Sequence, residues 1–514
     1  MLKILENGKL SFVLPLLLAV FCLFINFDLT DESYYLYHLI HPSELAMNFY
    51  HVLLHPVGEL FGHLALGYRI INFCLLLGSS LYFAQRTQKY LKLSGYTLLI
   101  SSLSFIYFCL LVALSYNSLL FVVFFLLVGS LLGPQNKTLT YLVYPALVII
   151  GFSCRSNQVF ILCSYILILG YLIHKKILWK EALLGFLLCL VIVLCHLEHT
   201  QEVIAVLKGH ALSVHYGILP SYLKAIAELF YKYFLVWGLL FLILNKFRPG
   251  WKEYFYPVVI LGYALATLDP AKAYKLLLAI CLIRLLELRK TLSPELFLIL
   301  FIGSFTPIII PIGTNNNLIE ASHFYIAFSA PFMIFIFKDL KWFRPIPIIH
   351  LGYILVATML IKGPFLKPYR NPSIFQTKYV PSENHLLRGL WIPQEIEESI
   401  KTISSVSAAL PPGPLLAMET LPSLPLFLNR DAYGTAWYFS GYRDLDQLGC
   451  TYIRFEKSKE MPTLALNRMI STEISKCLKE KNVPLDNYES LHDITIWSHK
   501  KPGTQTIKFF KAKA

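Results

Sequence analysis

The sequence carries little charge for its length, and this scarcity decides its broad class. Charged residues make up 15% of the 514 residues, whereas soluble globular chains carry roughly 25%. Hydrophobic residues reach 56%, the mean hydropathy is +0.58, and the apolar residues come in long runs. These values exclude an ordinary soluble globular protein and predict a polytopic membrane protein with a soluble tail.

Common signatures of catalytic and metal sites are also absent. The sequence contains no CxxC, G-x-G-x-x-G, P-loop, G-x-S-x-G or H-E-x-x-H, so no motif indicates a nucleotide fold, a serine hydrolase or a zinc protease. Eight of the ten cysteines lie in or beside apolar runs. The other two are Cys450 and Cys477. A disulfide between them requires an extracytoplasmic tail, and we expect unpaired cysteines.

The net charge of +14 does not indicate nucleic acid, because Lys and Arg sit mostly in short loops between apolar runs. About thirteen candidate spans extend from 10–27 to 345–361. With the N-terminus in the cytoplasm, fifteen positive charges fall in inside loops and five in outside loops, as the positive-inside rule requires. The range 10–27 is then an uncleaved anchor, and both the loop 28–64 and everything after 361 are extracytoplasmic.

The first outer loop, 28–64, contains no Lys or Arg. Apolar residues at helical spacing predict one or two helices along the membrane surface, broken near Pro42 and Pro56. His51 and His55 have metal-ligand spacing, but no zinc motif accompanies them, so we expect interfacial histidines and no metal. The loop's titratable residues are Asp28, Asp31, Glu32, Glu44, Glu59, His38, His41, His51, His55 and His63.

Asp28, Asp31 and Glu32 stand at i, i+3 and i+4, which places them on one face of a helix. One explanation is capping, with Thr30 as the N-cap and acidic residues in the first turn of a helix. The other is catalysis, because attack by an acceptor hydroxyl needs a carboxylate base beside the lipid surface. The residues alone leave both open.

A lipid-linked substrate also needs cations for its phosphate. Arg69 lies inside an apolar run, where an arginine is functional or paired, so an ion pair with Asp31 or Glu32 is the alternative. Arg155 stands at an outer boundary, where it either binds phosphate or snorkels. Lys272 and Lys275 are further candidates.

The turn "PIGTNNNLIEASHF" (311–324) is rich in Gly and Asn. Asn315 and Glu320 are candidates for binding sugar hydroxyls or a diphosphate, and turn geometry is the alternative explanation for the asparagines.

The tail, 362–514, is polar and begins with a proline-rich linker. Helices are predicted over "PQEIEESIKTISSVSAAL" and "NRMISTEISKCLKEK", and strands over "TYIRFEK" and "DITIWSH". Alternating strands and helices predict a small α/β domain. The sequence thus divides into a membrane domain, 1–361, and an extracytoplasmic domain, 362–514.

Several stretches belong together in a known arrangement. "DESYYLYHLIHP" (31–42) follows the first span, "LGYRIINF" (66–73) comes about thirty residues later, and "LSYNSLL" (114–120), the turn 313–315 and the tail stretches "PYRNPSIFQ" and "LRGLWI" complete the set. With these features the chain resembles the GT-C superfamily of integral-membrane glycosyltransferases, which includes protein O-mannosyltransferases and aminoarabinose transferases. The resemblance spans nearly the whole chain. The tail lacks the W-W-D motif of oligosaccharyltransferases.

The resemblance implies a mainly α transmembrane bundle with surface helices in its first outer loop. It implies an inverting transfer of a sugar from a polyprenyl-phosphate donor to an acceptor hydroxyl on a lipid, glycan or protein. Asp31 would be the base and Glu32 would orient Asp31 or the acceptor, with no cofactor. Two other readings remain: a transporter or flippase of lipid-linked saccharides, and a non-catalytic scaffold whose tail binds a partner. Membrane lipids, but no nucleic acid, are expected partners, and a bacterial inner membrane is the expected location.

Overall fold

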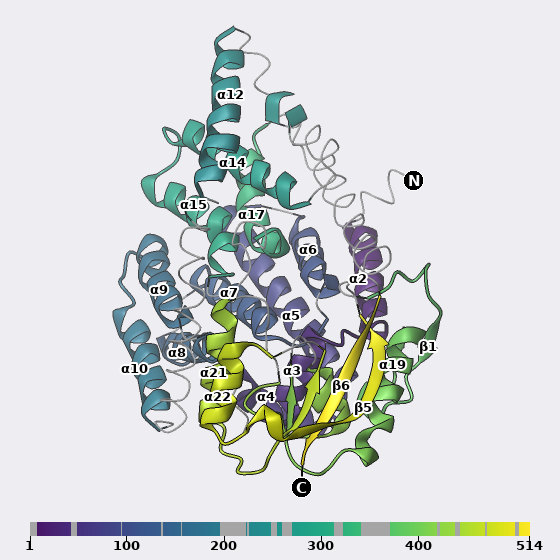
Figure 1. Ribbon diagram of the computed structural model, residues 1–514. Helices are drawn as coiled ribbons and strands as arrows, with labels where there is room; N and C mark the ends of the chain where they lie inside the picture. Colours follow the sequence, from purple (N-terminus) through teal and green to yellow (C-terminus); the bar gives the residue numbers. More distant parts are fainter. Residues whose placement is uncertain are drawn as a thin grey trace.

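The computed structural model describes residues 8–42, 49–93, 95–110, 112–134, 137–155, 157–195, 223, 226–247, 254–256, 258–259, 270–312, 322–340, 371–418, 422–436, 443–467, 470–498 and 503–513. Helices dominate the first three-fifths of the chain, and a smaller domain with a sheet lies at one end (Figure 1). The expected boundary near residue 361 lies outside the described residues.

The helical part begins with α2 (Gly8–Phe24) and the two loop helices α3 (Asp31–Ile40) and α4 (Tyr50–Leu60). Local chemistry sets several later helix starts. Ser115 and Ser118 form a capping box at α7, and Ser293 caps α15 just before Pro294. The remaining helices are α5 (Ala65–Leu91), α6 (Thr97–Leu110), α7 (Tyr116–Leu131), α8 (Lys137–Cys154), α9 (Gln158–His174), α10 (Trp179–Cys195), the π-helix η1 (Leu229–Leu235), α12 (Val236–Phe247), α14 (Pro270–Leu288), α15 (Pro294–Ile309), the 3-10 turn η3 (His323–Tyr325) and α17 (Ile326–Phe337).

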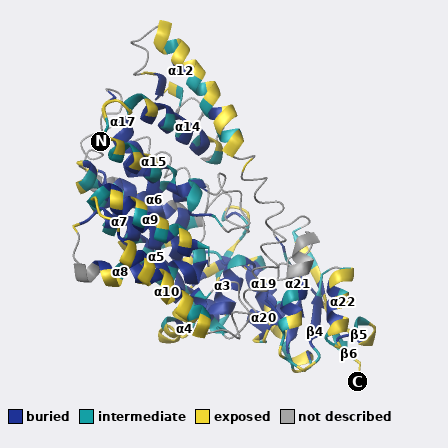
Figure 2. Ribbon diagram, turned by 90° about the vertical axis from the view of Figure 1, so that its left-hand side faces the viewer, coloured by how far each residue is buried: buried dark blue, intermediate teal, exposed yellow. Residues whose placement is uncertain are grey.

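Two of the described helices, Ala65–Leu91 and Ile226–Phe247, are long and apolar enough to cross a membrane. The other apolar helices are shorter, so the expected number of about thirteen spans stays a prediction. Large apolar side chains are nevertheless exposed along whole helices, as Figure 2 shows for α12. Soluble monomers rarely expose contiguous apolar surface of this extent. On α10 the exposed large apolar residues are Trp179, Leu183, Leu184, Phe186, Leu187, Leu188, Leu190, Val191 and Leu194.

Of the two helix breaks predicted in the loop 28–64, one is present and the other is not. The helix α3 ends at Ile40, before Pro42, as predicted. The helix α4 runs through Pro56, so the predicted break there is wrong. A proline inside a helix costs the hydrogen bond that its missing N–H would make, and this helix tolerates that loss.

The tail contains two sheets. In the small one β1 (Tyr379–Pro381) pairs antiparallel with β2 (Trp391–Pro393). The larger one has the order β3-β4-β6-β5, with β3 (Leu415–Ala417) parallel to β4 (Thr463–Leu466) and the other pairs antiparallel. Its long hairpin is β5 (Tyr488–Trp497) and β6 (Thr504–Ala512). The remaining elements are η6 (His385–Leu387), α19 (Gln394–Ser405), η7 (Ser407–Ala409), α20 (Ser423–Leu428), α21 (Arg443–Phe455), α22 (Thr472–Glu480) and η8 (Leu485–Asn487).

Two tail predictions are wrong. "TYIRFEK", which begins at Thr451, forms the end of α21 rather than a strand. Its β-branched and aromatic residues favour a strand locally, but packing against α22 overrides that preference. Cys450 and Cys477 are joined in a disulfide between these two helices, with the Cα atoms 5.5 Å apart, whereas we expected unpaired cysteines. The predicted helix around Thr472 and the strand over "DITIWSH" are confirmed.

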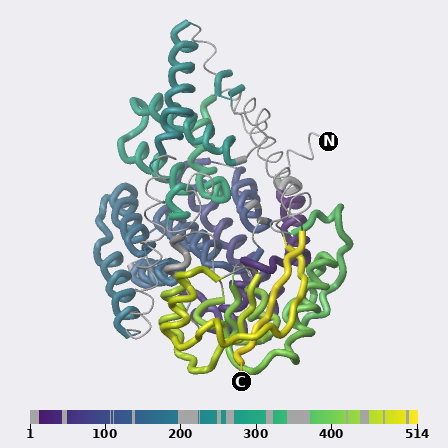
Figure 3. Tube along the Cα trace, viewed as in Figure 1, coloured from purple at the N-terminus to yellow at the C-terminus, as the bar shows by residue number. Residues whose placement is uncertain are grey.

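The tail packs directly on the first outer loop. The Asn26 N–H donates to the Trp391 carbonyl at 2.9 Å, and the Ala432 N–H donates to the Tyr37 hydroxyl at 2.8 Å. The rings of Phe27 and Phe427 lie 5.9 Å apart. In Figure 3 the dark purple segment that follows α2 accordingly lies against the yellow and green tail. The loop with the three carboxylates is therefore enclosed between the helices and the tail.

Candidate functional site

Asp28 is the residue that caps α3. One carboxylate oxygen accepts from the Thr30 N–H at 3.0 Å and from the Thr30 hydroxyl at 2.7 Å, and the other accepts from the Asp31 N–H at 2.9 Å. The Thr30 side chain makes no capping hydrogen bond, so the N-cap expected at Thr30 is supplied two residues earlier. Asp28 is buried, and its described side-chain contacts are those of a helix cap.

Glu32 and Arg69 form a fully enclosed ion pair. The Arg69 Nε and Nη2 atoms donate to the two Glu32 oxygens at 2.7 and 2.8 Å. The same guanidinium donates to the carbonyls of Leu23, Ile25 and Asn26 at 2.7–3.0 Å. All five N–H groups of Arg69 are thus used, and its side chain has 0% exposure.

The ion-pair alternative for Arg69 is therefore the one present in the structure. A phosphate would have to displace an existing acceptor, and the three carbonyls are those at and just after the C-terminal end of α2, where helix carbonyls have no partner within the helix. Glu32 is likewise saturated by Arg69, and its Oε2 also accepts from the Asp28 N–H at 3.3 Å. Both residues hold α2, α3 and α5 together.

Asp31 is the least buried of the three carboxylates. It is the first residue of α3, where the helix dipole favours a negative charge. One turn further along, burial first, and then the neighbouring Tyr116 and Asp31, raise the pKa of the Tyr35 hydroxyl far above its usual value. Tyr35 therefore stays protonated beside the Asp31 charge and keeps its O–H to donate.

A wall of tyrosines connects Asp31 to Arg155. The Tyr35 ring lies 5.7 Å from the Tyr116 ring, and the Tyr50 ring lies 6.1 Å from the same ring. The Arg155 guanidinium lies over Tyr116, 5.1 Å from the ring centroid. Residues from α3, α4 and α7 thus meet at the one ring of Tyr116.

Arg155 is buried but not saturated. Its Nη1 donates to the carbonyls of Ile310 and Ile312 at 3.0 and 3.3 Å, and its Nη2 donates to the Asn117 side-chain oxygen. The Nε is buried without a partner among the described residues. No described carboxylate pairs with this guanidinium, so Arg155 differs from Arg69 in having both an unused donor and an uncompensated charge.

Other polar atoms around Tyr116 also lack partners. The Tyr50 hydroxyl and the Gln158 side-chain oxygen are buried and make no hydrogen bond to a described residue. Buried polar groups in native proteins are nearly always satisfied, by protein, water or ligand. The neighbourhood of Arg155 is therefore a good place for a polar ligand.

No described contact joins the remaining expected site residues to the tyrosines or to Arg155. Lys272 is exposed in the first turn of α14, and Lys275 is buried one turn later. Asn315 and Glu320 lie outside the described residues. His55 approaches Glu59 at 3.6 Å and His63 accepts or donates to Tyr68 at 3.0 Å, but no group of three metal-ligating side chains occurs in the described part of the chain.

The tyrosines and Asn117 were not predicted as site residues from the sequence. Tyr34, Tyr35 and Tyr50 appeared there only as apolar residues at helical spacing, and "LSYNSLL" entered only through the resemblance. The signal available in the sequence was the density of tyrosines directly after the acidic triplet, at positions 34, 35 and 37. A tyrosine hydroxyl buried in a membrane loop needs a polar partner, which would have pointed to a shared polar site.

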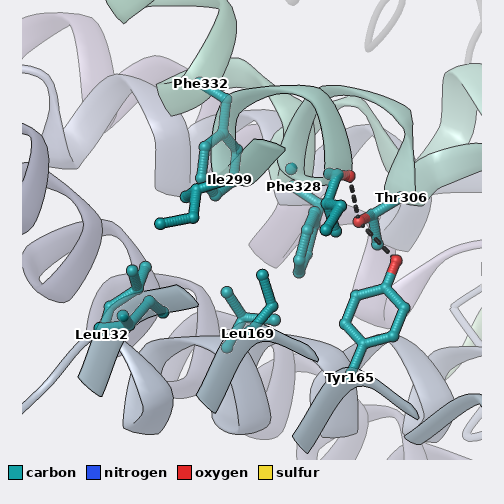
Figure 4. A pocket seen from close by; sticks show the side chains of 11 residues that line it. Leu132, Tyr165, Leu169, Ile299, Thr306, Phe328 and Phe332 are labelled. Atoms are coloured by element: carbon teal, nitrogen blue, oxygen red, sulfur yellow. Dashed lines mark hydrogen bonds between the residues drawn. The ribbon is translucent and has the colours of Figure 1, made fainter. Parts of the chain in front are cut away.

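A small apolar cavity of about 10 Å³ lies between α7, α9, α15 and α17. Leu132, Leu169, Ile299, Phe328 and Phe332 point into it, and the hydrogen bond between the Tyr165 hydroxyl and Thr306, 2.8 Å long, lies at its edge (Figure 4). Its wall on α15 ends one turn before Ile310, the residue whose carbonyl accepts from Arg155.

No family model and no curated protein matches the sequence. Among solved structures, one match is the apo form of ArnT from Cupriavidus metallidurans, with 12% sequence identity and a TM-score of 0.34. The match covers 96% of this chain and 97% of that chain. A similarity of this size leaves the family open.

Proposed function

We propose that the protein is a GT-C-type glycosyltransferase that moves a sugar from a polyprenyl-phosphate donor to an acceptor hydroxyl at the outer face of a membrane. The observation that carries the proposal is the pairing of a partly exposed carboxylate, Asp31, with a buried, uncompensated Arg155 across one wall of tyrosines. The acceptor belongs to a lipid, a glycan or a protein.

Asp31 is the proposed base. Asp28 caps α3 and Glu32 binds Arg69, and Asp31 is the least buried of the three carboxylates, so Asp31 is the one best placed to meet a substrate. It would take the proton from the acceptor hydroxyl while the acceptor oxygen attacks the anomeric carbon. The bond from that carbon to the phosphate oxygen breaks, the phosphate leaves with the electron pair, and the anomeric configuration inverts.

Arg155 is the proposed cation for the leaving phosphate. A fixed positive charge in a site shielded from water stabilises a developing anion strongly. The Nε–H of Arg155 and the Tyr50 hydroxyl, neither of which has a partner among the described residues, are hydrogen-bond donors on two side chains that both neighbour Tyr116. Glu32 and Arg69 would contribute indirectly, by fixing the start of α3 that carries Asp31.

The disulfide supports an extracytoplasmic tail. Disulfides persist in oxidising compartments, and the Cys450–Cys477 bond lies in the domain that packs on the outer loop. This agrees with the orientation expected from the loop charges, with the N-terminus in the cytoplasm, and with an inner-membrane location.

The test is Asp31→Asn in the full-length protein, reconstituted with synthetic polyprenyl-phosphate sugars that carry a radiolabel. We expect transfer to fall by about 10²–10⁴-fold, the usual loss of a general base, with an unchanged melting temperature. Asp28→Asn is the matched control for the loss of a carboxylate charge, because its amide oxygen can keep the two hydrogen bonds from Thr30 and only the bond from the Asp31 N–H is lost. Full activity in Asp31→Asn would exclude Asp31 as the base, and labelled donor crossing vesicles chemically unchanged would favour the flippase.

A further inference from the structure

The helix α2 exposes an apolar stripe that ends where the tail begins its contact. The exposed side chains recur at spacings of three or four residues and therefore share one face. In a membrane protein such a face meets lipid. These residues are Val13, Leu14, Leu17, Phe21 and Phe24.

A hairpin of the tail is bonded to the outer end of this stripe. The Asn26 N–H donates to the Trp391 carbonyl at 2.9 Å, Ile25 forms a bridge with Trp391, and the Tyr379 hydroxyl bonds the Asn26 side chain. The backbone of Trp391 is thus tied to the residues that follow Phe24. Trp391 therefore lies beside the end of the exposed apolar stripe of α2, at Phe24.

The same hairpin touches the start of a second apolar helix. Gly389, just before β2, has φ +91°, and a Cβ there would lie 3.0 Å from Leu66, in the first turn of α5. The helix α5 is one of the two described helices with the length and apolarity of a membrane span. The hairpin therefore rests on the outer ends of both α2 and α5.

The two faces of the hairpin differ in what covers them. Val380 pairs with Ile392, and the Ile392 side chain is fully buried in the tail core. Trp391 pairs with Pro381 on the opposite face, and the Trp391 side chain is 52% exposed. In the described part of the tail, the exposed large apolar side chains are Phe375, at 75%, and Trp391.

We propose that this hairpin is a membrane-surface anchor, with the Trp391 ring in the head-group layer of the outer leaflet. Tryptophan favours this layer because the ring is apolar while its N–H bonds to polar groups. The occupant is lipid because the exposed ring continues the lipid-facing stripe of α2. Lys378 and the exposed Arg388 flank the hairpin and suit anionic phosphates.

The anchor would fix the height of the tail over the site. Through α20 and Tyr37, the tail touches the helix that carries Asp31. A tail held at the lipid surface keeps that helix at the depth where a membrane-bound donor presents its phosphate. The inference rests on the proposed membrane insertion of the helices and not on sugar transfer.

The test uses the full-length protein, labelled with 5-fluorotryptophan, in nanodiscs of phosphatidylethanolamine and phosphatidylglycerol. The fluorine resonance of Trp391 is assigned by its loss in Trp391→Phe, and that of Trp237 in α12 by its loss in Trp237→Phe. Broadening is compared for three paramagnetic probes: a lipid spin-labelled on its head group, a lipid spin-labelled near the end of its acyl chain, and an aqueous gadolinium chelate.

We expect the head-group label to broaden Trp391 more than the other two probes do. Strongest broadening by the aqueous chelate would show a water-exposed ring, and no broadening by any probe would show a ring covered by protein or by a second copy. Either result overturns the anchor. Trp237 is the internal reference, since a lipid label must broaden it if α12 is inserted. Loss of that effect overturns membrane insertion as well, whereas loss of transfer in Asp31→Asn leaves the Trp391 result unchanged.

Discussion

Arg69 and Arg155 are both buried beside the end of a helix, but they differ in what their guanidinium groups bind. Both donate to main-chain carbonyls where a helix finishes: Arg69 to Leu23 and Ile25 after α2, and Arg155 to Ile310 and Ile312 after α15. Arg69 also meets a carboxylate and has no donor left. Apart from those carbonyls, the described contacts of Arg155 are the amide oxygen of Asn117 and the ring of Tyr116. Its Nε–H has no acceptor among the described residues.

The difference shows how to separate a structural cation from a ligand-binding one. Burying a charge is costly unless an opposite charge and hydrogen bonds compensate it. The positive charge of Arg69 is neutralised by Glu32 within the chain, so Arg69 needs no ligand. Arg155 has a positive charge that no described residue neutralises, so an anion from outside the chain would complete it.

The largest expected effect comes from breaking the pair of Arg69. Arg69→Met leaves Glu32 buried and unpaired, and removing one partner of a buried ion pair costs about 3–5 kcal/mol. Arg69→Met with Glu32→Leu removes both charges and should recover part of that loss, although the carbonyls at the end of α2 stay without a donor. Thermal unfolding of the purified protein in detergent measures both variants.

Arg69→Lys is the informative control for this pair. It keeps the charge but loses the fork that bonds Glu32 and three carbonyls together, so its melting temperature should lie between those of the wild type and Arg69→Met. If Arg69→Met unfolded at the wild-type temperature, the pair would not hold the three helices together.

The second prediction concerns Arg155, where a substitution should reduce activity more than stability. Arg155→Gln should reduce transfer by about 10²–10³-fold, the usual effect of removing one electrostatic donor from an active site, with a smaller stability change than Arg69→Met. Arg155→Lys keeps the charge and should retain more activity. Initial rates with a radiolabelled polyprenyl-phosphate sugar, together with melting curves, give both numbers.

Equal activity in Arg155→Lys and Arg155→Gln would mean that the charge at this position does not act on the phosphate. A stability loss as large as that of Arg69→Met would make Arg155 a second structural cation. Either outcome removes the difference between the two arginines.

Sequence patterns predicted most of the elements because they depend on local chemistry. Apolar runs predicted most of the described helices before residue 340, and "DITIWSH" predicted part of β5. The pattern failed at "TYIRFEK", where strand-forming residues lie in a helix that packs on α22. It also failed for the Cys450–Cys477 bond, because their 27-residue separation is closed by packing that spacing does not encode.

The site was only half predictable for a related reason. The acidic triplet, Arg69 and Arg155 could be selected by type and position in the chain. Which carboxylate each arginine meets depends on how α3 docks against α5 and α7, and this is set by contacts between distant residues. The capping role of Asp28 rather than Thr30 depends on the backbone turn at 28–30, which single-residue preferences do not specify.

The smallest expected effect is a change in stability on substitution of His38. It tests whether a buried polar group without a described partner always indicates a ligand. His38 lies two turns after Asp31, is 1% exposed, and neither ring nitrogen has a partner among the described residues. The rings of Tyr34, Tyr37 and His51 surround it. Burial, and then the neighbouring His51 and His41, lower the pKa of His38 well below its ordinary value of 6.5.

The sign of the pH dependence follows from this shift. Below pH 6.5 the unfolded chain binds a proton at His38, whereas the folded protein does not until its own lower pKa is reached. Folding therefore loses up to about 1.4 kcal/mol for each pH unit below 6.5 from this residue. His38→Leu removes that slope and should raise stability at pH 7 by about 1 kcal/mol, because an unsatisfied buried polar group is replaced by an apolar one.

Melting curves of the wild type and His38→Leu between pH 5 and 8 check this prediction, with transfer rates measured on the same samples. A flatter pH profile with unchanged transfer would make His38 an unfavourable buried group with no ligand. Arg155 would then stand apart, since its unpartnered donor comes with an uncompensated charge. A loss of transfer in a stable His38→Leu protein would instead extend the ligand-binding region from Arg155 along α3.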